Sequence, residues 1–324
     1  MAIATGIGSM PGTDFAESLR SILDTVGDLP FVPELPARGV HAGMIGRTLA
    51  LLDGLEADLQ PDGWRIGVGE GSDVRRARSL LIQDLDVAEE LTQDLEGAIK
   101  IQVTGPLTLA ATVERPRGDK MLADHGARRE ISESLAEGLR THVADVRRRF
   151  ARADLVVQVD EPAIAAVLSG GIPTASGWSR HRSVHPPEAD ALLRNVIEAI
   201  TGAGARPVVH SCAPDVPVEL LAGAGFSAIS FDLGLARPDD IWAETFEQGV
   251  DLWCGVVPST EAVGVSDKAL SGRIETFFGH FGFDAETYGP RLVVTPTCGL
   301  AGASPQWAPA ALTTAAATAA RFEG

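Results

Sequence analysis

The chain has 324 residues, of which 45% are hydrophobic and 22% charged, a composition typical of a globular protein. Its 44 acidic and 27 basic side chains give a formal net charge of −17. This balance argues against nucleic acid or an anionic membrane as the main partner, because both require a basic face. Three cysteines cannot form a disulfide framework, and no apolar run reaches the length of about 18 residues that a membrane span needs. The sequence therefore predicts a cytoplasmic protein.

Short apolar runs rich in β-branched residues alternate with longer amphipathic segments along the whole chain. The runs predicted to be strands are 3–7, a weak one at 30–32, 99–103, 155–159, 207–210, 228–231, 251–256 and 291–294. Runs that are apolar almost throughout are typical of parallel strands buried on both faces. The segments predicted to be helices are 13–26, 120–152, 187–202, 238–248, 267–279 and 305–322. Thr13 is the expected N-cap of the first helix.

Eight strands that alternate with helices predict the α/β class and, within it, a single (β/α)8 TIM barrel that forms one domain over residues 1–324. The alternative is a doubly wound sheet. It lacks support because no G-x-G-x-x-G motif follows the first strand. Active sites of such barrels lie in the loops after the carboxyl ends of the strands. Polar residues at those positions are therefore the candidate functional residues.

A histidine and two cysteines stand at predicted strand ends. His210 and Cys212 are two residues apart, so in an extended conformation their side chains point to the same side. Cys298 follows the last strand, which closes the barrel beside the first. One imidazole and two thiolates suit a catalytic zinc, which has three protein ligands and one open position. The alternative is that all three are ordinary core residues, as we expect for Cys254 in the middle of a strand.

An acidic pair, Asp160 and Glu161, ends the strand predicted at 155–159. Carboxylates there must face solvent, a ligand or a cation, because unpaired charges are costly inside a barrel. Alternatively, the pair caps the following helix. Residues 104–106 (TGP) are predicted to form a tight turn only. Structural or surface roles, without a paired ligand, are expected for the remaining histidines, which are His41, His125, His142, His181, His185 and His280.

Five motifs, in this order, resemble those of the C-terminal catalytic barrel of cobalamin-independent methionine synthase. Residues 5–11 (TGIGSMP) are similar to the family's T-x-I-G-S-F-P, and residues 104–108 (TGPLT) to its T-G-P-V-T. Residues 158–163 (QVDEPA) resemble Q-I-D-E-P-A. The sequence HSC at 210–212 stands where the family has H-x-C, and PTCGL at 296–300 stands where it has P-D-C-G-L.

The resemblance implies a TIM barrel in which His210, Cys212 and Cys298 bind catalytic Zn²⁺. The family's remaining zinc ligand is a glutamate, and the corresponding residue here is Asp232, whose side chain is one methylene shorter.

The resemblance also implies an amino acid site. The family holds its substrate through the I-G-S turn and the first Asp of D-E-P-A, which here are Ile7, Gly8, Ser9 and Asp160. Asp160 would pair with the substrate ammonium and is the expected catalytic residue. Glu34 is the nearest candidate, by order along the barrel, for a further family glutamate.

The implied activity is zinc-dependent methyl transfer to a thiol, with homocysteine as acceptor and methionine as product. Full-length members have a second, N-terminal barrel that helps to hold a folate donor, and this sequence matches the C-terminal barrel only. The expected methyl donor is therefore either a folate or a methylated corrinoid protein. Two alternatives stay open: a metal-free enzyme resembling uroporphyrinogen decarboxylase, and a non-catalytic homologue that binds zinc or an amino acid.

Overall fold

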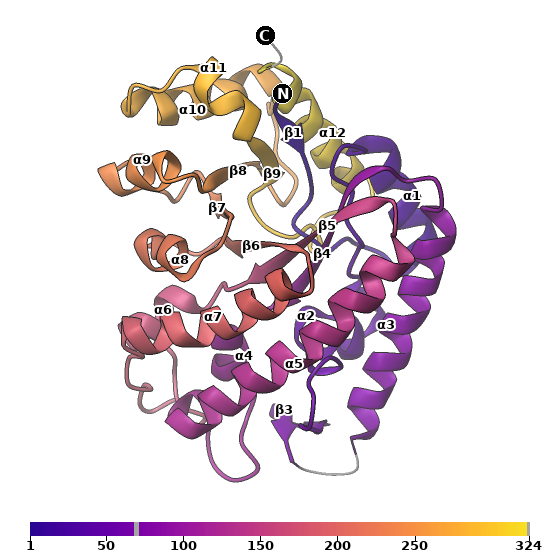
Figure 1. Cartoon of the computed structure of the whole chain (residues 1–324), viewed down its shortest axis with the longest axis vertical. Helices are drawn as coiled ribbons and strands as arrows, with labels where there is room; N and C mark the ends of the chain where they lie inside the picture. The colour runs from indigo at the N-terminus through magenta and orange to yellow at the C-terminus, as the bar shows by residue number, and fades with distance from the viewer. Residues whose placement is uncertain (68–70, 323–324) are drawn as a thin grey trace.

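The computed structural model describes residues 1–67 and 71–322. Its centre is a curled sheet of seven parallel strands in the order β1-β9-β8-β7-β6-β5-β4, surrounded by helices (Figure 1). The strands are β1 (Ile3–Ala4), β4 (Gly97–Thr104), β5 (Ala153–Asp160), β6 (Arg206–Ser211), β7 (Ala228–Asp232), β8 (Asp251–Val257) and β9 (Val293–Pro296).

The eighth position of the barrel, between β1 and β4, is held by the segment 30–34. Phe31 pairs with Lys100 of β4, and Glu34 pairs with Ser9 just beyond β1. The Lys100 N–H donates to the carbonyl of Pro30 at 2.8 Å, and the Glu34 N–H donates to that of Gly8 at 3.0 Å. The predicted (β/α)8 barrel is thus confirmed. Its weakest predicted strand, at 30–32, forms only isolated bridges to its neighbours among the described residues.

Helices cover the outside of the sheet, with α5 and α7 in front in Figure 1 and α12 beside α1. The helices are α1 (Phe15–Thr25), α2 (Met44–Leu49), α3 (Ser72–Leu91), α4 (Pro106–Thr112), α5 (His125–Arg149), α6 (Ile164–Ser169), α7 (Pro186–Gly202), α8 (Val218–Ala224), α9 (Asp240–Glu247), α10 (Asp267–His280), α11 (Ala285–Tyr288) and α12 (Trp307–Ala320). Short 3-10 turns occur at Pro36–Arg38, Val40–Ala42, Met121–Ala123 and Gly289–Arg291.

Two predicted helix starts were wrong, for the same physical reason. Helix α1 is capped by Asp14 rather than Thr13, since the Asp14 carboxylate accepts the N–H of Glu17 at 2.9 Å. Helix α5 begins after Asp124, whose carboxylate accepts the N–H of Ala127 at 2.9 Å, five residues later than predicted. In both helices an aspartate satisfies a free N–H of the first turn and fixes the start.

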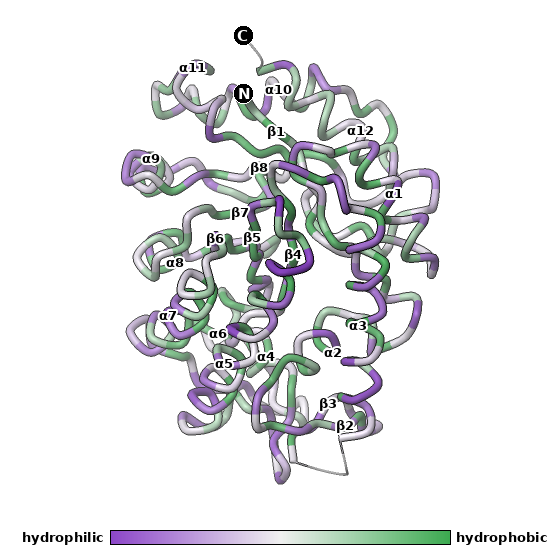
Figure 2. The backbone as a smooth tube through the Cα atoms, turned by 45° about the vertical axis from the view of Figure 1, so that its right-hand side comes forward, coloured by the Kyte–Doolittle hydropathy of each residue, from purple (hydrophilic) through white to green (hydrophobic). Residues whose placement is uncertain are grey.

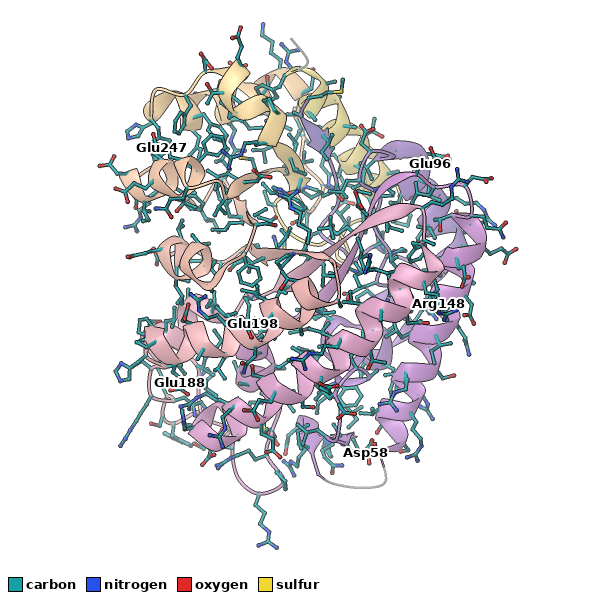
Figure 3. The ribbon with its side chains drawn as sticks, viewed as in Figure 1. Asp58, Glu96, Arg148, Glu188, Glu198 and Glu247 are labelled. Carbon is teal, nitrogen blue, oxygen red and sulfur yellow. The ribbon has the colours of Figure 1, made fainter. Side chains whose placement is uncertain are left out.

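The hydropathy of the chain follows this arrangement. Figure 2 shows hydrophobic stretches along the central strands and hydrophilic ones on outer helices and loops. The exposed side chains of Arg148, Glu198 and Glu247 lie on the outer helices α5, α7 and α9 (Figure 3). No described helix is both long and apolar enough to cross a membrane.

A small antiparallel hairpin, β2 (Ala57–Gln60) with β3 (Gly63–Ile66), adds to the rim of the barrel and was not predicted. The backbone of Glu114 bridges to this hairpin: its N–H donates to Trp64 and its carbonyl accepts from Ile66, both at 2.9 Å. The buried Glu114 carboxylate also binds the Arg65 guanidinium. Backbone hydrogen bonds and an ion pair therefore both hold the hairpin to the segment that follows α4.

Candidate metal and amino acid site

Three sulfur and nitrogen ligands meet at the carboxyl end of the barrel. His210 lies on β6, Cys212 follows that strand directly, and Cys298 lies two residues beyond β9. Their ligand atoms all lie within 4.8 Å of one another. The two Sγ atoms are 2.9 Å apart, and both cysteines are free. Strands far apart in the chain thus bring one imidazole and two thiols to a single point.

The imidazole of His210 is oriented by the neighbouring strand. Its Nδ1 lies 3.0 Å from the hydroxyl oxygen of Ser230 on β7. Its Nε2 is buried and has no hydrogen-bond partner among the described residues. A metal-binding histidine is typically held in this way, with one ring nitrogen fixed by a neighbour and the other directed to the metal. A buried unpartnered nitrogen beside two thiols therefore fits a bound metal ion.

The pKa values of the two cysteines are shifted in opposite directions. The hydrogen bond from Cys212 lowers the pKa of Cys298 to about 4, and His210 acts in the same direction. The same hydrogen bond, together with burial, raises the pKa of Cys212. The pair therefore holds one thiolate at neutral pH. A bound Zn²⁺ takes both cysteines as thiolates, and two thiolates with an imidazole form a donor set that it prefers.

Asp232 does not join these three residues in the structure. It ends β7, and its Oδ1 accepts the N–H of Gly234 at 2.7 Å within its own loop. Burial raises its pKa, and its side chain lines a neighbouring cavity of about 270 Å³ together with Phe231 and Trp242. The short aspartate side chain turns back onto its own loop instead of reaching the sulfurs.

The metal candidates open into a cavity of about 200 Å³. All five residues predicted to bind the substrate also line it: Ile7, Gly8, Ser9, Glu34 and Asp160. Four further residues that the sequence did not single out complete the wall: Pro36, Met44, Pro162 and Gly299. The structure therefore gathers the predicted amino acid residues and three of the four predicted metal residues around one space.

The turn at Ile7–Ser9 approaches its neighbours closely. A Cβ atom at Gly8 would lie 2.7 Å from side-chain carbons of Gln102, so only glycine fits. A Cβ at Gly299 would lie 2.1 Å from the hydroxyl oxygen of Ser9, and the Leu300 N–H donates to the Ser9 carbonyl at 2.8 Å. The loops after the first and last strands thus meet at the cavity and shape its wall.

Two buried carboxylates face the cavity. Burial raises the pKa of Glu34 and of Asp160, because a charged carboxylate loses its hydration there. Arg47 partly offsets this for Glu34, with its Nε 3.7 Å from Oε1. Asp160 accepts a hydrogen bond from Gln158 at 2.7 Å. An ammonium group entering the cavity would find two carboxylates whose charge is only partly compensated.

Glu161 has a different role from Asp160. Its carboxylate accepts the N–H groups of Leu107 at 2.9 Å and Thr108 at 2.8 Å, and the Thr108 hydroxyl at 2.7 Å. It therefore caps helix α4 of the preceding βα unit, not the helix that follows it. A Cβ at Gly105 would lie 2.2 Å from Glu161 Oε1. The turn predicted at 104–106 is consequently also the start of a helix.

Three of the remaining histidines contact carboxylates, which the sequence did not predict. His41 lies 2.8 Å from Asp73, His125 lies 2.8 Å from Glu188, and His181 lies 3.1 Å from Asp119. Each pair joins different loops or helices. These pairs agree with the structural role that was expected for the histidines.

The fold and the site define a class of protein: a (β/α)8 barrel with a candidate metal centre and a carboxylate-lined pocket at the carboxyl ends of its strands. The model of the family described as cobalamin-independent synthase, catalytic domain, matches residues 65–321. The chain belongs to this family, as its motifs predict. No curated protein sequence matches the chain.

Solved structures resemble the chain at low sequence identity. A B12-independent methionine synthase from Shewanella sp. W3-18-1, in complex with selenomethionine, is 14% identical with a TM-score of 0.66. The match covers 99% of this chain and 98% of that one. The β-mannanase from the blue mussel Mytilus edulis is 11% identical with a TM-score of 0.48, over 97% of this chain and 91% of that one. The first match supports the barrel fold of the family.

Proposed function

We propose that this protein is a zinc-dependent methyltransferase that transfers a methyl group to the thiol of homocysteine and so produces methionine. One observation carries the proposal: His210, Cys212 and Cys298 open into the same small cavity as Asp160 and its partners. Family membership supports it. The selenomethionine in the similar Shewanella structure supports an amino acid of this shape as the ligand.

The sulfur end of the cavity would hold the metal. His210, Cys212 and Cys298 are the residues present to bind it. When bound, zinc lowers the pKa of a thiol ligand so that the thiol is a thiolate at neutral pH. Asp232 lies outside this group of three, and its Oδ1 accepts the N–H of Gly234. The three-residue set alone leaves the open position that a substrate sulfur requires.

The other end of the cavity would hold the amino acid backbone. Asp160, with Glu34 beside it, pairs with the substrate ammonium, and the Gly8–Ser9 turn places the carboxylate. Holding these groups fixes where the sulfur lies, and such positioning lowers the barrier to an in-line transfer. Their burial strengthens each charge interaction, because little water remains to screen it.

The first experiment is to measure zinc per chain by elemental mass spectrometry in protein purified without added metal. We expect about one zinc per chain. Methyl transfer to homocysteine is then assayed with methyl-folate and, separately, with a methylated corrinoid protein. Absence of zinc after reconstitution under reducing conditions would remove the proposed mechanism. Zinc and methionine binding without transfer from either donor would instead favour the non-catalytic homologue.

A further inference from the structure

A buried arginine lies behind one carboxylate of the candidate amino acid pocket. Arg47 is on helix α2, and only 6% of it is exposed. Its Nε lies 3.7 Å from Oε1 of Glu34, which is 4% exposed and lines the pocket. Arg47 itself lines a separate internal cavity, together with Gln102 and His142. It therefore reaches the pocket carboxylate from behind the pocket wall.

A second buried carboxylate fixes the guanidinium. Asp84 lies on helix α3, is 3% exposed, and accepts Nη1 of Arg47 at 2.6 Å. Its other oxygen accepts Nη1 of Arg38 at 2.6 Å. A guanidinium is planar and presents its N–H groups in a rigid fork. Because Asp84 holds one nitrogen of Arg47, the direction in which Nε faces Glu34 is set by helix α3.

The backbone of Glu34 is fixed independently of this arginine. The Glu34 N–H donates to the carbonyl of Gly8 at 3.0 Å, and the Glu34 carbonyl accepts the N–H of Met10 at 2.8 Å. The backbone therefore leaves the direction of the side chain open. A carboxylate offers about four acceptor positions on its two oxygens, so Glu34 can face both Arg47 and an ammonium in the pocket.

We propose that Arg47 is a positioning residue of the amino acid pocket. Held by Asp84, its guanidinium fixes the direction of the Glu34 carboxylate, to which the ammonium of the ligand binds. Arg47 acts through Glu34 and does not touch the ligand. The inference rests on the proposed function for the identity of that ligand.

The first test requires neither ligand nor activity. Crystal structures of the unliganded wild type, Arg47→Met and Arg38→Met are compared. We expect the Glu34 side chain to leave its wild-type rotamer, or to occupy more than one, in Arg47→Met. Arg38→Met is the matched control, because it removes the other arginine from Asp84 and should leave Glu34 in place. A wild-type Glu34 rotamer in Arg47→Met would overturn the proposal.

The second test is a double-mutant cycle that measures methionine binding to zinc-loaded protein by calorimetry. We expect Arg47→Met to weaken binding by about 10-fold when Glu34 is present, and by less than about 2-fold in the Glu34→Gln background. The difference arises because Arg47 acts only through the Glu34 carboxylate. Arg38→Met should bind methionine like the wild type, and zinc content should be equal in all variants. An equal loss in both backgrounds would contradict the proposal.

A conservative variant covers the case in which Arg47→Met does not fold. Arg47→Lys keeps a positive charge beside Asp84, but an ammonium is a point charge without the planar fork and should not hold both carboxylates. We expect it to weaken methionine binding by about 3-fold or more, and again only when Glu34 is present. Wild-type affinity in Arg47→Lys, with Glu34 in its wild-type rotamer, would count against the role of the fork.

The two tests separate this inference from the proposed function. If Glu34 changes direction in Arg47→Met but no donor methylates homocysteine, the proposed reaction fails while the role of Arg47 stands. If methionine does not bind to the wild type, the unliganded crystal structures still decide whether Arg47 positions Glu34.

Discussion

Asp160 and Glu161 are adjacent in the chain, yet their carboxylates serve opposite sides of the barrel wall. Asp160 lines the pocket and accepts a hydrogen bond from Gln158, whereas Glu161 binds the first turn of α4. Successive side chains of a strand point to opposite faces, which separates the two. One dipeptide thus supplies both a pocket carboxylate and a helix cap.

The separation predicts that Asp160→Asn affects ligand binding alone. The amide removes the charge that would pair with the substrate ammonium, and a charged hydrogen bond contributes about 1.5–3 kcal/mol. We expect the KM for homocysteine to rise about 10- to 100-fold. Steady-state kinetics and elemental analysis check this together, because zinc content should stay at the wild-type level. An unchanged KM would count against the role of Asp160.

Glu161→Gln is expected to affect stability instead. Glutamine offers one acceptor oxygen where Glu161 uses two, so an N–H of α4 is left unpaired at a cost of about 1–3 kcal/mol. Burial raises the pKa of Glu161 from its ordinary 4.5 to about 7. The native state then binds this proton more tightly than the unfolded state, so this contribution to stability is lost as pH rises from about 4.5 through 7.

Urea unfolding of both proteins at pH 5, 6 and 7 measures this effect. The difference in slope between wild type and Glu161→Gln isolates the glutamate, since all other titrating groups are shared. An equal pH dependence in the two proteins would show that Glu161 keeps its ordinary pKa.

Cys298→Ser should abolish stoichiometric zinc binding, because it removes one of the three ligands gathered among the described residues. Cys254→Ala is the matched control: Cys254 is fully buried in β8, and we expect it to retain about one zinc. Elemental mass spectrometry on the two variants, purified in parallel, gives the comparison. Equal zinc in both would place the metal elsewhere.

The thiols should differ in reactivity in metal-free protein. Cys212 and Cys298 are partly exposed and share one thiolate, whereas burial raises the pKa of Cys254. A disulfide reagent should therefore modify two thiols of the folded protein, and zinc should protect both. Three reactive thiols in the folded state, or no protection by zinc, would contradict the arrangement.

Asp232→Ala tests whether this residue completes the metal site. If Asp232 moves to the metal, the variant should still bind one zinc but lose it faster to a chelator, because one ligand is missing. Asp239→Ala, from the same neighbouring cavity, is the control. The measurement is the rate at which a chelator removes zinc from the two variants, starting from equal zinc loading. Equal release rates would indicate that Asp232 is not a ligand of the metal.

Most of the barrel was predictable because buried parallel strands carry continuous apolar runs. Helix α3 was missed, although apolar residues at 74, 77, 81, 85 and 88 repeat with helical spacing. Its start has no local cap: Asp58 of β2 accepts the N–H groups of Gly71 and Asp73, both at 2.9 Å. A cap supplied from a distant strand cannot be recognised in a local pattern.

A search of the predicted strand ends finds those site residues that stand there. It does not find Pro36 and Met44, which line the cavity from a 3-10 turn and from the start of helix α2. Asp232 was expected at the metal site from the family resemblance, but the direction of its side chain depends on the N–H of Gly234, which the resemblance does not determine.

The contact between Gly299 and Ser9 has a consequence for synthesis of the protein. The pocket wall comes from both extremes of the chain, since residues near position 8 and near position 298 must meet to form it. A growing chain on the ribosome therefore carries His210 and Cys212 long before it can offer Cys298. A metal held by all three residues therefore has to await the strand that carries Cys298.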